Sequence, residues 1–114
     1  MSFFDSDVVR SELSQIQEIQ EDLYKNIFEF PKMDNEEKIK HVEMLERLLE
    51  KQRILYCRLS LSEDPEAKQM RERIFESAKL MGLPSDVSMQ DVFSNMASML
   101  EAMKKKIDKT GTDL

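Results

Sequence analysis

The chain has 114 residues, the length of one small domain, and its 23 acidic and 17 basic side chains give a formal net charge of -6 at pH 7. It contains 2 glycines and 3 prolines, while 40% of residues are hydrophobic and 35% charged, which excludes collagen-like, loop-rich and low-complexity classes and favours amphipathic helices. The negative charge also opposes broad contact with nucleic-acid phosphates.

Three breaks, each marked by a proline, divide the chain into four helical blocks. The first break centres on Pro31, the second closes with Pro65, and the third combines Gly82 with Pro84. Proline opposes continuation of a helix, and Gly82 can take the left-handed conformation that closes one. We therefore predict helices over residues 6–29, 35–60, 65–81 and 88–108.

Candidate N-caps, the polar side chains that accept hydrogen bonds from a first helical turn, stand at the start of every block. They are Asp5 or Ser6, Asp34, Asp64 and Ser88. Glu37 and Asp91 follow two of these caps by three residues, which is the spacing of a capping box. The start of each helix is therefore predicted independently of the breaks.

Apolar residues recur at steps of three and four in every block, as expected of amphipathic helices. The first block carries Val9, Leu13, Ile16, Leu23 and Ile27, with Gln20 as the one polar member of the stripe. The second block carries Val42, Leu45, Leu49, Gln52, Tyr56 and Leu59. No block alternates with a period of two. We expect an all-α fold, a small self-associating bundle of about four amphipathic helices, with one domain over residues 1–108 and a frayed tail over 109–114.

Few side chains are candidates for chemistry. His41 is the single histidine, and Glu37 lies four residues before it, so we expect an exposed hydrogen-bonded pair rather than a metal site, which needs more ligands. Cys57 lies inside a predicted helix with no second histidine to act as its base, so a structural thiol is expected. Two glycines cannot supply a phosphate-binding loop. We therefore expect no enzymatic activity, no metal or other cofactor, and no small-molecule substrate.

The expected location follows from the cysteine content and the apolar stretches. The single cysteine cannot form an intrachain disulfide, and no cationic, apolar leader begins the chain. The longest strongly apolar stretch, Ile54–Cys57, is far shorter than the roughly 20 residues of a membrane helix. We expect a cytoplasmic protein without a membrane partner.

A basic cluster near the C-terminus consists of Lys104, Lys105, Lys106 and Lys109. Basic side chains in the last turns of a helix complement its dipole, and this accounts for most of the cluster. No aromatic residues are interleaved with it, so direct nucleic-acid binding is not the leading expectation.

Methionine is unusually frequent, with 9 residues in the chain, several of them in the fourth block. A methionine stripe can fill irregular core space or form an adaptable docking surface; the core interpretation is the commoner, and both stay open. The Phe3-Phe4 pair can staple the first helix or reach a neighbouring subunit. The candidate partner or dimer surface comprises Phe3, Phe4, Met89, Phe93, Met96, Met99 and Met103.

Several segments, read in order along the chain, carry a family likeness. They are Phe3 to Val9, Arg53-Ile54 with Arg58, Leu61 to Pro65 with Ala67, Phe93 to Met96, and Leu100 to Lys104. In these segments the chain resembles a small protein family of cyanobacteria and their phages that is catalogued as a domain of unknown function. The double phenylalanine followed by Asp5-Ser6 is the most specific part, and residues 55–57 depart from the family pattern. The resemblance implies an all-helical fold and a cytoplasmic cyanobacterial or phage-infected setting, and it assigns no catalytic residue.

These observations predict a non-catalytic helical module for protein–protein interaction, an adaptor or regulator that forms a homodimer and docks on an unidentified protein partner. Missing catalytic groups and several apolar helix faces motivate this prediction. The alternative is a nucleic-acid-associated phage or host regulatory factor that uses the C-terminal lysine cluster.

Overall fold

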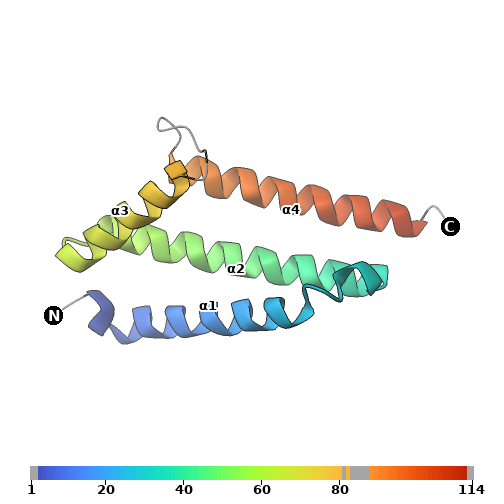
Figure 1. Cartoon of the computed structure of the whole chain (residues 1–114), viewed down its shortest axis with the longest axis horizontal. Coiled ribbons are helices and arrows are strands. Elements are labelled where there is room, and N and C mark those ends of the chain that lie inside the picture. Colours follow the sequence, from blue (N-terminus) through green and yellow to red (C-terminus); the bar gives the residue numbers. More distant parts are fainter. Residues whose placement is uncertain (1–2, 81, 83–87, 113–114) are drawn as a thin grey trace.

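The computed structural model describes residues 3–80, 82 and 88–112, and within them the fold is all-α. Its four helices are α1 (Asp7–Asn26), α2 (Asn35–Leu61), α3 (Pro65–Leu80) and α4 (Met89–Thr112), as Figure 1 shows. Two short 3-10 turns, η1 (Phe3–Asp5) and η2 (Phe30–Lys32), precede α1 and α2. No strand occurs in the described ranges, so the predicted fold class is confirmed.

The first helix and the last end at different residues from those predicted. α1 ends at Asn26 rather than at residue 29, and a turn then leads into η2. Pro31 accounts for the early end, because its ring would clash with the carbonyl of residue 27 in a continuous helix. α4 continues to Thr112, so residues 109–112 are helical where we expected a frayed tail. Lys109 lies in this last turn, where its charge complements the helix dipole.

The predicted caps form at three of the four helix starts. The Asp34 carboxylate accepts from the Glu37 N–H at 2.8 Å, and the Asp64 carboxylate accepts from the Glu66 N–H, also at 2.8 Å. The Ser88 hydroxyl accepts from the Asp91 N–H at 3.2 Å. Ser6 occupies the N-cap position of α1, but its side chain makes no capping hydrogen bond.

The third break contains the left-handed residue that its sequence predicts. Gly82 has a φ of 95°, and its N–H donates to the Lys79 carbonyl at 3.0 Å. Glycine adopts this conformation without the steric cost that a Cβ imposes. The residues around it, 81 and 83–87, lie outside the described part of the chain.

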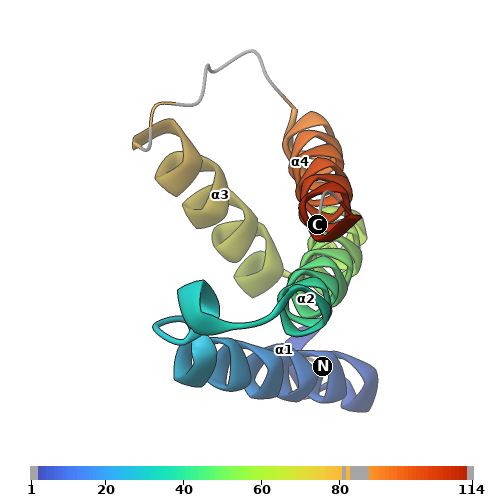
Figure 2. The ribbon, with the colours of Figure 1, turned by 90° about the vertical axis from the view of Figure 1, so that its right-hand side faces the viewer.

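The helices are arranged around α2, which packs against each of the other three. α1 and α4 lie along opposite sides of α2 and run in the same direction, antiparallel to it, while α3 crosses near one end (Figure 1). Figure 2, turned by 90°, shows α1, α2 and α4 as a curved layer, with α3 inclined away from it. The fold is therefore an open arrangement rather than a closed bundle.

The core is concentrated at the α1–α2 contact. Its fully or nearly buried apolar side chains are Val9, Ile16, Ile19 and Leu23 of α1, Val42, Leu49 and Leu59 of α2, and Ala67 of α3. Among the described side chains of α4, none is fully buried. The radius of gyration is 16.6 Å, compared with about 13 Å for a compact domain of this length. α4 consequently rests on α2 through one side and leaves the rest of its surface open.

Candidate docking groove

An apolar groove runs between α1 and α4 over the surface of α2. Its volume is about 490 Å³. The lining residues are Gln20, Leu23 and Tyr24 of α1, Ile27 at the C-cap of α1, Phe30 and Pro31 of η2, His41, Leu45 and Leu48 of α2, and Met103 of α4. We call this site the α1–α4 groove.

Helical spacing explains why these residues meet. Gln20, Tyr24 and Ile27 are separated by four and three positions, so they share one side of the α1 end. His41, Leu45 and Leu48 have the same separation on α2 and form the floor. The break at Pro31 turns the chain back over this floor, so that Phe30 and Pro31 close one end of the groove.

His41 is buried in the floor of the groove, so the expectation of an exposed histidine paired with Glu37 is wrong. Its ring lies against Phe30, with 5.1 Å between the ring centroids and 50° between the planes. η2 covers this side of α2, which the sequence spacing of Glu37 and His41 did not reveal. Burial lowers the pKa of His41 below its ordinary value, so the imidazole is neutral at pH 7.

The methionine edge, which we define as Met96, Met99 and Met103 of α4, reaches the groove at Met103. These side chains are separated by three and four residues, so they follow one side of the helix. All three are exposed, and Met99 keeps 66% of its surface accessible. Met103 belongs to both the edge and the groove lining, which makes the two surfaces continuous. The methionine edge is therefore exposed surface in the single chain.

Two further candidate residues of α4 lie nearer to α3 and are half-buried. Met89 begins the helix, and the Phe93 ring is 5.9 Å from the Tyr56 ring of α2, centroid to centroid. Phe93 also lines a separate space of about 340 Å³ together with Ile74 of α3. α3 thus fills part of the apolar surface at this end, whereas the α1–α4 groove stays open.

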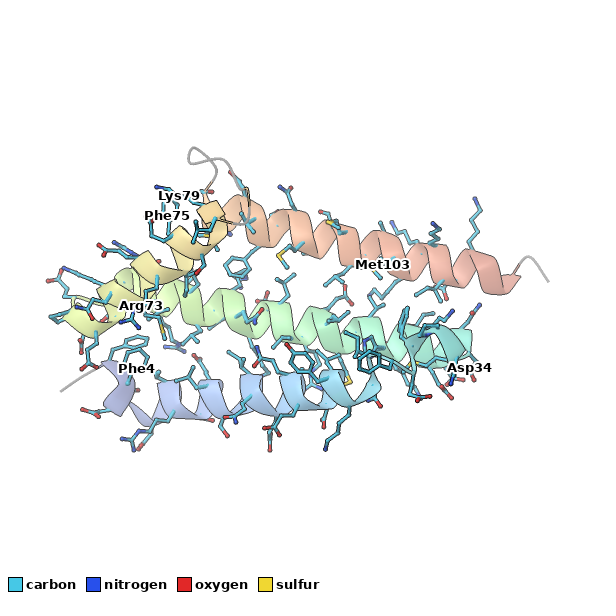
Figure 3. The ribbon with its side chains drawn as sticks, in the orientation of Figure 1. Phe4, Asp34, Arg73, Phe75, Lys79 and Met103 are labelled. Carbon is cyan, nitrogen blue, oxygen red and sulfur yellow. The ribbon has the colours of Figure 1, made fainter. Side chains whose placement is uncertain are left out.

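Phe4 lies near one end of the molecule, away from Met103 on α4 (Figure 3). Phe3 and Phe4 are both half-buried, and their rings meet edge to face with centroids 5.1 Å apart. The Phe3 N–H donates to the Asp64 carboxylate, and the Phe4 carbonyl accepts from Arg10 Nε at 3.2 Å. These contacts join the start of the chain to the start of α3, so the seven candidate residues do not form one surface.

Sequence analysis missed Tyr24 and Phe28 near the end of α1, and it placed Ile27 on the apolar stripe without predicting its exposure. Tyr24 is 73% exposed, and Ile27 and Phe28 are exposed as well. Tyr24 follows Gln20 by four residues, a spacing that could have placed it on the same stripe. Their exposure depends on how the helices pack together, which no local pattern encodes.

Most of the lysine cluster lies on the surface of α4, but Lys104 is paired within the chain. Its ammonium lies 2.8 Å from the Glu46 carboxylate of α2 and 3.4 Å from that of Glu101. The hydrogen bond to Glu46 raises the pKa of Lys104. Lys104 therefore fastens α4 to α2, which leaves a smaller basic patch than the sequence suggests.

Among the described residues, no group of three or more His, Cys, Asp or Glu side chains is placed to hold a metal ion. No helix over the described part of the chain combines the length and apolarity needed to cross a bilayer. The α1–α4 groove is lined almost entirely by apolar groups, so its geometry suits the burial of apolar surface.

Comparison with known proteins places the chain in a family. The profile of the family described as Domain of unknown function (DUF1825) matches residues 1–107, and the chain belongs to this family. No curated protein and no solved structure matches the chain significantly.

Proposed function

We propose that this member of the DUF1825 family is a non-catalytic helical module for protein–protein interaction, an adaptor or regulator that docks through the α1–α4 groove. The resemblance of the sequence to cyanobacterial and phage proteins supports a cytoplasmic setting in a cyanobacterial or phage-infected cell. The groove supports this proposal because its lining is almost entirely apolar and contains no reactive group of side chains.

The observation on which the proposal rests is the continuity of the groove with the methionine edge. Together they form an apolar surface from Tyr24 on α1, across His41, to Met99 on α4. A large exposed apolar patch is costly in water and commonly marks an interaction site. A concave patch between helices suits an amphipathic helix, which can lay its apolar face into the groove.

Methionine supports the same interpretation. Its side chain is unbranched and polarizable, so it can repack against partners of different shape. Met99 and Met103 therefore form a border that can adjust to an incoming helix. Self-association into a homodimer is part of the proposal, because a second chain is the partner always available.

The proposal is tested by affinity capture from cyanobacterial lysate with three matched baits. They are the natural chain, a groove variant carrying Tyr24→Lys and Ile27→Lys, and a control carrying Leu61→Lys. All three substituted residues are exposed, so each variant should remain folded. Leu61 belongs to α2 but is absent from the groove lining.

We expect the groove variant to lose proteins, including untagged chain, that the control retains. Equal retention by all three baits, or by none, contradicts the proposal.

The lysine cluster supports the nucleic-acid alternative less well. Lys104 is already paired with Glu46 and Glu101, and the chain has a net charge of -6. Phosphate contacts should be strongest at low ionic strength. Binding to duplex or single-stranded DNA at about 50 mM salt would favour the alternative, and we expect none.

A further inference from the structure

We infer that the occupant of the α1–α4 groove is α4 of a second copy of this chain, seated antiparallel to α1 and α4 of the first. This inference rests on the proposed function, because it names the partner of the same site. The second helix would bring its own methionine edge into the groove. Each copy would then complete the open bundle of the other.

The directions of the helices define the open position. α1 and α4 run in parallel on two sides of the antiparallel α2, as three helices of an up-down four-helix bundle do (Figures 1 and 2). α3 occupies the fourth position at one end of α2, beside Phe93, and the α1–α4 groove is the uncovered part of that position at the other end. The bundle pattern calls for a helix there that runs opposite to both neighbours.

A twofold axis gives the second α4 this direction. When the axis is perpendicular to α4, the helix of the second copy runs antiparallel to that of the first. The contact is then isologous, so that the methionine edge of each chain meets the groove of the other. Because Met103 belongs to both surfaces, the two α4 helices can lie side by side across the axis. Two chains suffice, and the contact does not propagate into a filament.

The elongated chain exposes more surface than a compact monomer. Its accessible surface measures 8409 Å², compared with about 6,500 Å² expected for a compact monomer of 13.4 kDa. The surplus is about 1,900 Å² over the whole molecule, and each partner buries roughly 800 Å² in an interface of standard size. A second copy seated on the groove would cover part of this surplus.

Charge does not oppose a second copy at this surface. The chain has a net charge of -6, so two copies repel when their acidic surfaces face each other. No carboxylate lines the groove, and burial keeps His41 neutral. The methionine edge is uncharged as well. Contact through these surfaces removes apolar area from water without desolvating charges in the groove.

The first test is the molar mass in solution, measured by light scattering after size exclusion. We expect about twice 13.4 kDa for the natural chain, with a shift to 13.4 kDa for Met99→Lys and no shift for Leu61→Lys. Met99 is 66% and Leu61 85% exposed, so both lysines can be placed without entering the core. A monomeric natural chain, or a dimer that Met99→Lys leaves unchanged, overturns the inference.

Cross-linking tests the seating of the helix. In a Cys57→Ser background, a chain with Met99→Cys is mixed with a chain carrying Tyr24→Cys and oxidised. We expect a disulfide between the two chains, and none when Leu61→Cys replaces Met99→Cys. Equal yields for both pairs overturn the inference.

Failure of the inference can be separated from failure of the proposed function. A monomer that still captures a different protein through the groove overturns the second copy as occupant, while the docking function stands. A monomer without groove-dependent capture overturns both. A natural chain that is dimeric, together with a Met99→Lys variant that is monomeric, supports both.

Discussion

His41 determines how the floor of the groove responds to acid. Its neutral ring packs against the Phe30 ring of η2. Lys38 Nζ of α2 lies 5.7 Å from the centroid of the same Phe30 ring. Protonation would put a charge on a buried ring, and this desolvation cost lowers the pKa of His41.

The free energy of unfolding should therefore fall as the pH is lowered below about 6.5, the ordinary histidine value. In this range the unfolded chain binds a proton that the folded chain binds only at lower pH, so protons favour the unfolded state. The fall should level off below the folded pKa. Urea unfolding at about pH 7.5 and about pH 5.5 measures the effect.

His41→Gln provides the control, because glutamine is polar but does not titrate. Asp64 and Glu50 also have lowered pKa values, but their ordinary values are 3.8 and 4.5, below this window. The variant should lose the pH dependence that the natural chain shows. The same slope in both proteins would mean that His41 is not its source.

Leu59 and Leu61, two leucines at the end of α2, test the position of the core. Leu59 is 1% exposed, whereas Leu61 is 85% exposed. Leu59→Ala should lower the free energy of unfolding by about 2–5 kcal/mol, because it removes buried methyl groups and leaves a cavity. Leu61→Ala should change it by less than about 0.5 kcal/mol. Urea unfolding of the two variants checks this order, and equal losses would contradict the assigned packing.

At the level of the helices, the carboxylate of Asp64 stabilises the connection between α2 and α3. Asp64 accepts from the Glu66 N–H at the start of α3 and from the Phe3 N–H of η1, and these two donors hold its pKa below the ordinary value. This connection therefore joins three elements, whereas the Asp34 cap of α2 serves a single helix start.

Replacement of the two caps should separate these roles. Asp34→Ala should cost about 1 kcal/mol of stability, the usual loss for an N-cap. Asp64→Ala should cost more, because the Phe3 contact is lost together with the cap. Thermal unfolding of both variants provides the comparison. A smaller loss for Asp64→Ala would show that η1 adds nothing to this connection.

Local sequence patterns predicted the elements well and their mutual arrangement poorly. Pro31, Gly82 and the caps at Asp34 and Ser88 act within a few residues, so their structural effects were visible in the sequence. The burial of His41 depends on η2 folding back over α2, which is a contact between elements. Spacing alone cannot indicate that contact.

The same distinction applies to the candidate site. The methionines of α4 were predicted as a stripe, but the stripe pattern is the same for core and for surface. Only the placement of α4 beside α2 shows that Met99 is exposed and that Met103 reaches the groove. The sequence also left two interpretations for Phe3, and only the structure shows that its N–H donates to the Asp64 carboxylate.

At the scale of the whole molecule, the uncovered α1–α4 groove is the feature on which the proposed function depends. Three helices around α2 leave a long molecule, 56 × 33 × 20 Å, with an apolar groove on its surface. A closed four-helix bundle would bury the corresponding surface. The central claim is therefore that another helix covers this groove when the protein works.

Methionine oxidation tests this claim without knowledge of the partner. Peroxide converts an accessible methionine to its sulfoxide, and mass spectrometry measures the rate at each site. The rates at Met96, Met99 and Met103 should be compared between a dilute purified chain and the chain at its natural concentration in lysate. We predict that all three oxidise several-fold more slowly in lysate, relative to the half-buried Met44 and Met70. Equal relative rates in the two conditions would contradict the account, because they would show the groove border uncovered where the protein works.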